Sequence, residues 1–123
     1  MSTFAKIAKA LGDEGRLRLM CALDREKELC ACQLTELLAL APSTLSKHLG
    51  ILKQVGLLKS RRNATWIYYA INHDTTDALL KEWIAFTLTA ARKAPEYREV
   101  KRKLRSIKKF DPEELCCKQR IRS

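Results

Sequence analysis

The sequence predicts a mainly α-helical domain that contains one two-stranded β-hairpin. Apolar residues recur at helical spacing over most of the chain, beginning with Phe4, Ile7 and Leu11. Residues 58–71 instead alternate between two faces, as a pair of strands does. Pro42 breaks the helical pattern between two neighbouring helices. With 123 residues, the chain is long enough to form one domain with a hydrophobic core.

The first 40 residues predict three helices. The first ends before Asp13, which can cap the second. In the second helix Cys21 falls on the apolar stripe, so we expect it to pack in the core. Residues 27–29 form a short extended or loop segment. Leu34 and Leu37 then give one or two turns of a third helix.

The helix that follows Pro42 has an apolar face and a polar face. At about 100° per residue, Leu45, Leu49 and Leu52 form a core stripe. Because the turn before this helix is short, the two helices form a helix-turn-helix candidate. His48 lies at the border of the stripe, where it could donate to a phosphate or simply pack. The side chains that can bond base edges or phosphates are Ser43, Thr44, Ser46, Lys47, Lys53 and Gln54.

The predicted hairpin places two arginines near its tip. We expect Arg61, Arg62, Asn63 and Ala64 to form this tip, where the two arginines and the turn-prone asparagine protrude. Helix, helix, short helix, turn, helix, two-stranded ribbon and long helix is the order of a winged helix-turn-helix. In such a module the second helix of the motif enters the major groove of DNA, and the ribbon lies along the backbone or minor groove. Arg61 and Arg62 would then neutralise phosphates.

The helix after the hairpin is predicted to run from Asp74 to about Ala94. Trp83 lies on its main apolar stripe, and Leu79 and Phe86 widen that stripe. A helix that is apolar nearly all round is buried on two sides. We therefore expect a partner subunit to cover this helix.

Charge divides the chain into two parts. The net charge is +10, and residues 1–94 and 95–123 contribute +5 each, the second part in a much shorter length. We divide the chain accordingly into a winged helix-turn-helix DNA-binding and dimerisation domain, residues 1–94, and a basic helical tail, residues 95–123. A balance this basic favours nucleic acid as partner.

The sequence also argues against several classes of protein. No apolar run approaches the ~20 residues of a membrane span, and the N-terminus lacks a signal-peptide pattern. We therefore expect a cytoplasmic location and no membrane partner. In that compartment the five cysteines are expected to be reduced, metal-binding or redox-active. The chain has no Gly-rich phosphate loop and no Cys-x-x-Cys in a βαβ pattern, so we expect no enzyme and no organic cofactor.

Four segments resemble a known family: LGDEGRLRLMCAL, ELCACQL, STLSKHLGILKQVGLL and RRNATWIYYAI. They are similar to the corresponding segments of the ArsR/SmtB family of metal-responsive repressors, and the resemblance covers roughly residues 3–92. It implies a homodimeric repressor of a metal-resistance operon, which binds an inverted-repeat operator in double-stranded DNA and releases it when metal binds. It also implies that the first helix and the long helix after the wing form the dimer.

The resemblance to the arsenic-sensing branch implies that Cys30 and Cys32 bind trivalent arsenic or antimony. This branch usually has a third cysteine where this chain has Thr35. Soft ions select thiolates, and these two ions prefer three of them. Our hypothesis is that one or both of Cys116 and Cys117 complete the metal site, within one chain or across the dimer. Cysteines two apart share a face only in extended backbone, so this segment must be extended or distorted.

Two other functions stay open. One is a redox-responsive repressor in which the pairs Cys30/Cys32 and Cys116/Cys117 form disulfides. The other is a constitutive nucleoid or RNA-binding protein that uses the basic tail. Zinc on the long helix is not expected, because the chain has only His48 and His73 as imidazole ligands.

Overall fold

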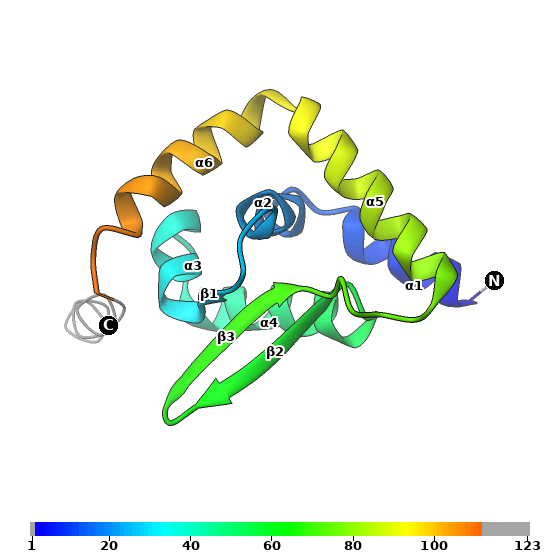
Figure 1. Cartoon of the computed structure of the whole chain (residues 1–123), viewed down its shortest axis with the longest axis horizontal. Coiled ribbons are helices and arrows are strands. Elements are labelled where there is room, and N and C mark those ends of the chain that lie inside the picture. Colours follow the sequence, from blue (N-terminus) through cyan, green and yellow to red (C-terminus); the bar gives the residue numbers. More distant parts are fainter. Residues whose placement is uncertain (1, 112–123) are drawn as a thin grey trace.

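Helix α2 lies at the centre of the fold, and helices α5 and α6 form an arch over it (Figure 1). On the other side of α2, helix α4 lies behind the β-sheet, and in this view α3 and α1 lie to the left and right of α2. The computed structural model describes residues 2–111. In chain order the elements are α1 (Ser2–Leu11), α2 (Glu14–Leu23), β1 (Leu29–Cys30), α3 (Ala31–Leu38), α4 (Pro42–Gln54), β2 (Leu58–Asn63), β3 (Trp66–Ile71), α5 (Ala78–Lys93) and α6 (Pro95–Ile107).

The core forms where the apolar faces of these helices meet. The second half of α2 is completely enclosed, with Leu19, Met20 and Leu23 each 0% exposed. Burying a side chain of this size contributes about 1.5–3 kcal/mol. The predicted stripe of α4 is confirmed, since Leu45, Leu49 and Leu52 are all buried. Cys21 of α2 is also part of the core, as predicted.

The helix-turn-helix consists of α3 and α4. Helix α3 ends at Ala39, whose φ of 52° is left-handed. The chain is extended again at Ala41, and α4 begins at Pro42, as predicted. Because proline lacks an N–H and has a suitable φ, it fits this first helical position.

The wing is the antiparallel hairpin of β2 and β3, but the sheet has a third strand. Strand β1 pairs with β3, and the sheet order is β1-β3-β2. The predicted tip is wrong in detail: Arg61 and Arg62 lie inside β2, and the turn follows at Ala64, where φ is 58°. Pairing of β2 with β3 continues to Asn63, which lies opposite Trp66, and so extends farther than the turn-prone residues suggested.

Helix α5 begins later than predicted. Its cap is Asp77, whose Oδ1 accepts the N–H of Leu80 at 3.1 Å. Asp74 instead forms an ion pair with Lys59. Capping requires an acceptor directly before the first turn, and only Asp77 has that position. The face of α5 toward the core also includes Ile84, which is buried.

Helix α6 packs on the same core as the winged domain. Its three apolar residues Val100, Leu104 and Ile107 are buried. The proposed boundary after residue 94 therefore separates two segments that share one core. None of the helices in residues 2–111 is both long and apolar enough to cross a membrane. Cys116 and Cys117 lie outside the described residues.

Candidate DNA-reading surface and thiol pair

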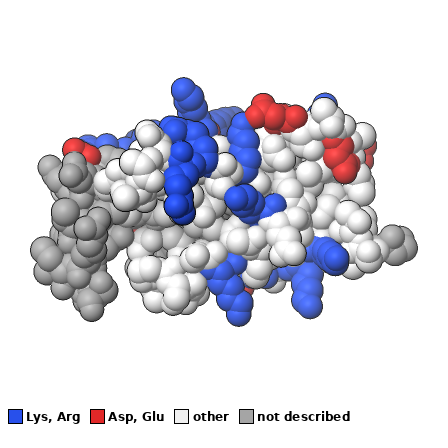
Figure 2. Space-filling model, turned by 90° about the horizontal axis from the view of Figure 1, so that it is seen from below, with Lys and Arg blue, Asp and Glu red and all other residues white. Residues whose placement is uncertain are grey.

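The polar face of α4 is accessible over its whole length. Lys47 and Lys53 are exposed, and no side chain caps the helix N-terminus at Ala41. The first backbone N–H groups of α4 can therefore donate to an anion such as a phosphate. Figure 2 shows Lys and Arg spread over the middle of the face that includes the wing, with few Asp and Glu. The other predicted contact residues of α4 are also exposed: Ser43, Thr44, Ser46 and Gln54.

His48 is turned toward the start of α2. Its Nδ1 lies 3.1 Å from Nη1 of Arg16, and its Nε2 lies 3.8 Å from Oδ2 of Asp13. Since the guanidinium can only donate, Nδ1 accepts and the ring proton of neutral His48 is on Nε2. The side chain of His48 is 16% exposed. This geometry favours the packing role left open above, and a phosphate contact by His48 stays a prediction.

Asp13 connects this contact to the backbone. Its Oδ2 accepts the N–H of Arg16 at 3.0 Å, which confirms the predicted cap of α2. This backbone hydrogen bond is the main reason that the pKa of Asp13 is lowered. Arg16 also donates from Nε to the carbonyl oxygen of Ala10. The end of α1, the start of α2 and the middle of α4 are thus joined through Arg16.

The two wing arginines have different surroundings. The Nε of Arg61 donates to Oε2 of Glu28 at 2.8 Å, and its guanidinium lies 4.6 Å from the centre of the Tyr68 ring. The hydrogen bond from Arg61 lowers the pKa of Glu28, and the same bond raises the pKa of Arg61. Arg62 is exposed on the wing. Glu28, which sequence reasoning did not assign a role, therefore holds one of the two arginines.

Cys30 caps the first helix of the helix-turn-helix. Its Sγ accepts the N–H of Cys32 at 3.3 Å, and its own N–H donates to Oε1 of Gln33 at 2.9 Å. Cys30 is 1% exposed, and Cys32 is half-buried. Together these two hydrogen bonds form a capping box at the start of α3.

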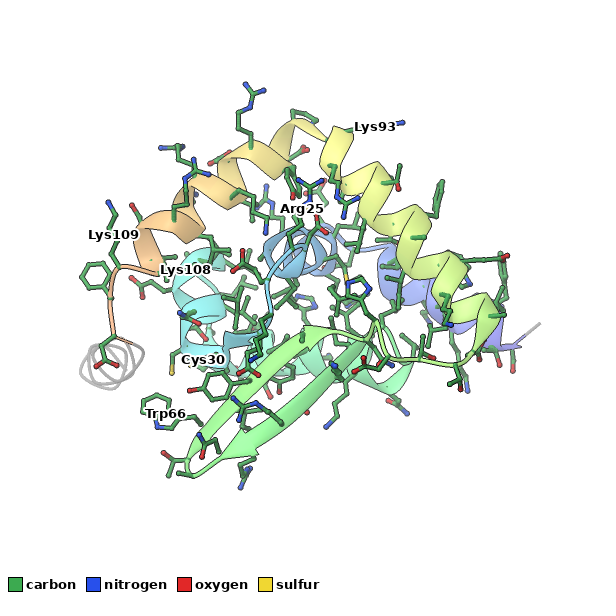
Figure 3. All side chains as sticks on the ribbon, in the orientation of Figure 1. Arg25, Cys30, Trp66, Lys93, Lys108 and Lys109 are labelled. Carbon is green, nitrogen blue, oxygen red and sulfur yellow. The ribbon has the colours of Figure 1, made fainter. Side chains whose placement is uncertain are left out.

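Cys30 also belongs to the sheet. Its partner across the β1–β3 ladder is Tyr68 of the wing. Figure 3 shows Cys30 beside the start of α3, with Trp66 farther out on the wing. The backbone is extended at Cys30, and α3 begins at the next residue, Ala31. Cys30 therefore contacts both parts of the predicted DNA-binding unit.

Thr35 and Cys21, two other described residues with oxygen or sulfur side chains, have different surroundings. The hydroxyl of Thr35 donates to the carbonyl oxygen of Ala31 at 2.9 Å, inside its own helix. Cys21 is 4% exposed, and burial raises the pKa of its thiol. Within residues 2–111, no three His, Cys, Asp or Glu side chains are grouped so that they could hold a metal ion.

Comparison with known proteins gives consistent results. Residues 13–60 match the family described as bacterial regulatory protein, arsR family. The chain is 36% identical to the arsenic resistance transcriptional regulator ArsR1 of Pseudomonas putida over 89 residues, which is 64% of this chain and 70% of that protein. It is 39% identical to the arsenical resistance operon repressor of Bacillus subtilis over 74 residues, which is 60% of this chain and 70% of that one.

A solved structure agrees with the fold. The homodimeric winged helix-turn-helix DNA-binding domain of a possible ArsR-family regulator from Mycobacterium bovis superimposes with a TM-score of 0.61. It is 25% identical in sequence, and the match covers 75% of this chain and 81% of that one. Winged helix-turn-helix geometry, an accessible polar face on α4 and a relative 36% identical over most of its length lead to one assignment. The chain is a winged helix-turn-helix DNA-binding protein of the arsR family of bacterial regulatory proteins, and not an enzyme.

Proposed function

We propose that this protein is a transcriptional repressor that releases its operator when Cys30 and Cys32 bind trivalent arsenic or antimony. The observation that carries the proposal is the position of Cys30, which caps α3 and pairs with the wing at once. The names of the relatives from Pseudomonas putida and Bacillus subtilis, which refer to arsenic resistance, support the choice of inducer. Its place of action is the cytoplasm.

The third thiolate would come from Cys116 or Cys117. The cysteines among the described residues are Cys21, Cys30 and Cys32, and Cys21 is in the core. Thr35 occupies the position of the third cysteine in the arsenic-sensing branch, and its hydroxyl is bonded to its own helix. A pyramid of three sulfurs therefore requires the tail, from the same chain or from the partner subunit.

Binding would act by displacing the cap. Because Cys30 is buried and its Sγ accepts a helix N–H, its sulfur can join an ion only if the start of α3 moves. That movement disturbs the turn to α4 on one side and the β1–β3 pairing on the other. The ion then favours a conformation with low affinity for DNA. A 100-fold loss of operator affinity needs a coupling free energy of about 2.7 kcal/mol.

The operator would be an inverted repeat read by a homodimer. A two-fold dimer presents two copies of α4, so the half-sites lie about 34–36 Å apart, or a multiple of that distance. Ser43, Thr44, Ser46 and Gln54 would contact base edges or phosphates. Lys47, Lys53 and Arg62 would contact phosphates, with Arg61 joining them if it leaves Glu28. Operator affinity should therefore fall steeply with salt.

Replacing Cys32 by Ser tests the thiol mechanism. We expect the variant to bind operator DNA as the wild type does, because the hydroxyl is isosteric, and to resist release by arsenite. The measurement is fluorescence anisotropy of labelled operator, titrated with arsenite under strictly reducing conditions. Cys21→Ala is the matched control, since it removes a core thiol that lies on α2, and it should still respond.

The tail is tested separately. A variant with Cys116→Ser and Cys117→Ser should show fewer sulfur neighbours of arsenic by X-ray absorption than the wild type, and weaker arsenite binding. An unchanged sulfur count would exclude the tail as donor. Release by an oxidant alone, with no response to arsenite under reduction, would replace the metalloid mechanism by the disulfide mechanism.

A further inference from the structure

Positive charge is concentrated in one part of the arch, the end of α5 and α6. This part is separate from α4 and the wing, which carry the predicted DNA contacts. Residues 92–109 contain nine Lys and Arg and two Glu, a net charge of +7. Figure 1 shows this segment across α2 from α4 and the wing. A straight duplex bound to α4 and the wing would therefore not contact it.

These cations surround an open groove between α6 and the end of α2. The groove has a volume of about 850 Å³, and seven of its twelve lining residues are Lys or Arg. The acidic side chain among them is Glu26. In Figure 3, Arg25 lies between α2 and the arch, and Lys93 and Lys108 lie on either side of it along the arch. The three are parts of the same lining.

The floor of the groove is fixed by ion pairs. Asp24, which is 1% exposed, accepts two hydrogen bonds from Arg92, at 2.8 and 2.7 Å. Glu26 lies 3.7 Å from the Nζ of Lys101 and 2.6 Å from that of Lys108. These contacts neutralise Arg92, Lys101 and Lys108 in part and hold α6 against the end of α2.

The rim has cations without such partners. Arg25, Lys93, Arg98 and Arg105 are exposed and form no ion pair within residues 2–111. Arg25 has a φ of 64°, a left-handed conformation that non-glycine residues rarely adopt. Arg98 and Arg105 are seven residues apart on one face of α6, which separates them by about 10 Å along the helix. Measured along the axis of a duplex, where each strand has a phosphate every ~3.4 Å, this distance corresponds to about three phosphate steps.

We propose that this groove binds the phosphate backbone of a second segment of double-stranded DNA while α4 holds the operator. The cations are distributed along a helix instead of converging on one point, which suits a polyanion better than a single small anion. Tyr97 is the aromatic residue of the described lining; it donates its hydroxyl to Asp24 and has the Nζ of Lys101 5.7 Å from its ring centre, so its surroundings are already polar. Contacts to phosphates carry no sequence information, so the groove would bind a duplex of any sequence.

This inference rests on the proposed function, because it needs operator-bound protein. It would let one molecule hold flanking DNA that bends back, or a distant duplex. If Arg98 and Arg105 each neutralise one phosphate, the log of the affinity for the second duplex should fall with the log of the salt concentration with a slope of about −1.8.

The test is a bridging assay with the full-length protein. Operator duplex is fixed to beads and saturated with protein, and free protein is removed. A labelled duplex of unrelated sequence is then added, and both its retention and the protein left on the beads are measured. We expect the wild type to retain the second duplex, and the variant with Arg98→Gln and Arg105→Gln to retain at least 10-fold less while staying on the operator.

A matched control changes the same number of charges elsewhere. Lys103→Gln with Lys81→Gln alters another side of α6, where Lys103 pairs with Glu99 at 3.3 Å, and the first turn of α5, and neither residue lines the groove. This variant should retain the second duplex like the wild type. Equal retention by the Arg98 and Arg105 variant, or none by the wild type, would overturn the inference.

The other outcomes are also decisive. If single-stranded RNA or polyglutamate is retained and duplex DNA is not, the groove binds another partner and the inference is wrong. If the wild type does not bind the operator at all, the proposed function fails instead, and this is seen before the second duplex is added.

Discussion

Ala39 shows strain at the level of a single residue, in the turn that joins α3 to α4. Its φ of 52° brings the Cβ close to the carbonyl oxygen, which costs roughly 1–2 kcal/mol for a residue other than glycine. Glycine is the usual residue where a helix ends in this conformation. The chain therefore gives up some stability at the turn that sets the angle between the two helices.

Ala39→Gly should raise the free energy of unfolding by about 0.5–1 kcal/mol, because glycine adopts this φ without strain, although it also loses more entropy on folding. Urea denaturation measures the change. The control is Ala85→Gly, the same substitution at an exposed helical position of α5, which should cost about 1 kcal/mol. A loss of stability at both positions would show that Ala39 is not strained.

At the residue scale, local signals predicted local structure well. Asp13 was predicted as a cap and is one, because capping depends on residues within one turn. Asp74 and Asp77 have the same chemistry, and only the actual start of α5 distinguishes them. The pair of Glu28 and Arg61 joins residues 33 positions apart, so no spacing rule could reveal it.

At the scale of elements, a single buried carboxylate joins three helices. Asp24, at the end of α2, accepts hydrogen bonds from Arg92 of α5 and from the hydroxyl of Tyr97 of α6, the latter at 2.7 Å. Burial by itself raises the pKa of Asp24, but the hydrogen bonds and charges of Arg92, Tyr97 and Lys101 outweigh it, so the pKa is lowered. The charged form is therefore the one that stabilises the fold.

The sign of the pH dependence follows. An aspartate with a lowered pKa contributes stability above its unfolded pKa of about 3.9, and this contribution is lost as pH falls through the folded pKa. Asp24→Ala should cost about 1–3 kcal/mol at pH 7, and its difference from the wild type should shrink below about pH 4. Denaturation at several pH values measures this. Asp74→Ala, which removes an exposed ion pair, should show no measurable loss.

The third strand is the element that the sequence pattern could not reveal. Strand β1 has two residues, Leu29 and Cys30, and alternation cannot be recognised over so short a length. Its existence depends on pairing with β3, which is about 40 residues away in sequence. The thiol pair itself was found from sequence, but its connection to the wing was not.

At the scale of the whole molecule, the charge distribution suggests a boundary after residue 94, but the hydrophobic core continues across it. The sequence suggested a separate basic tail after residue 94, yet α6 contributes Val100 and Leu104 to the common core. Helical periodicity indicated these apolar positions but not which surface they would cover. The excess apolar surface of α5, in contrast, was predicted from the sequence and is present, since Phe86 is 70% exposed and Leu79 is 42% exposed.

This apolar surface extends onto the neighbouring helices and supports the proposed homodimer. Phe4 is 49% exposed and its ring centre lies 4.9 Å from that of Trp83, while Leu17 is 38% exposed. A cavity of about 420 Å³ between α2 and α5 is lined by Leu17, Trp83 and Phe86. The indole N–H of Trp83 is buried and has no hydrogen-bond partner in residues 2–111. A second copy would cover these groups.

Phe86→Glu should therefore convert the dimer to a monomer. Because Phe86 is exposed in the single chain, the variant should keep its helical circular dichroism spectrum. Two copies of the side chain meet the interface, and losing about 2 kcal/mol of apolar burial from each would raise the dimer dissociation constant roughly 1,000-fold. Sedimentation equilibrium measures this change, with Ala85→Glu on another side of α5 as the control. Because operator binding needs two linked copies of α4, the monomeric variant should also lose affinity for the inverted repeat while keeping its affinity for a single half-site. A Phe86→Glu protein that stays dimeric would place the interface elsewhere.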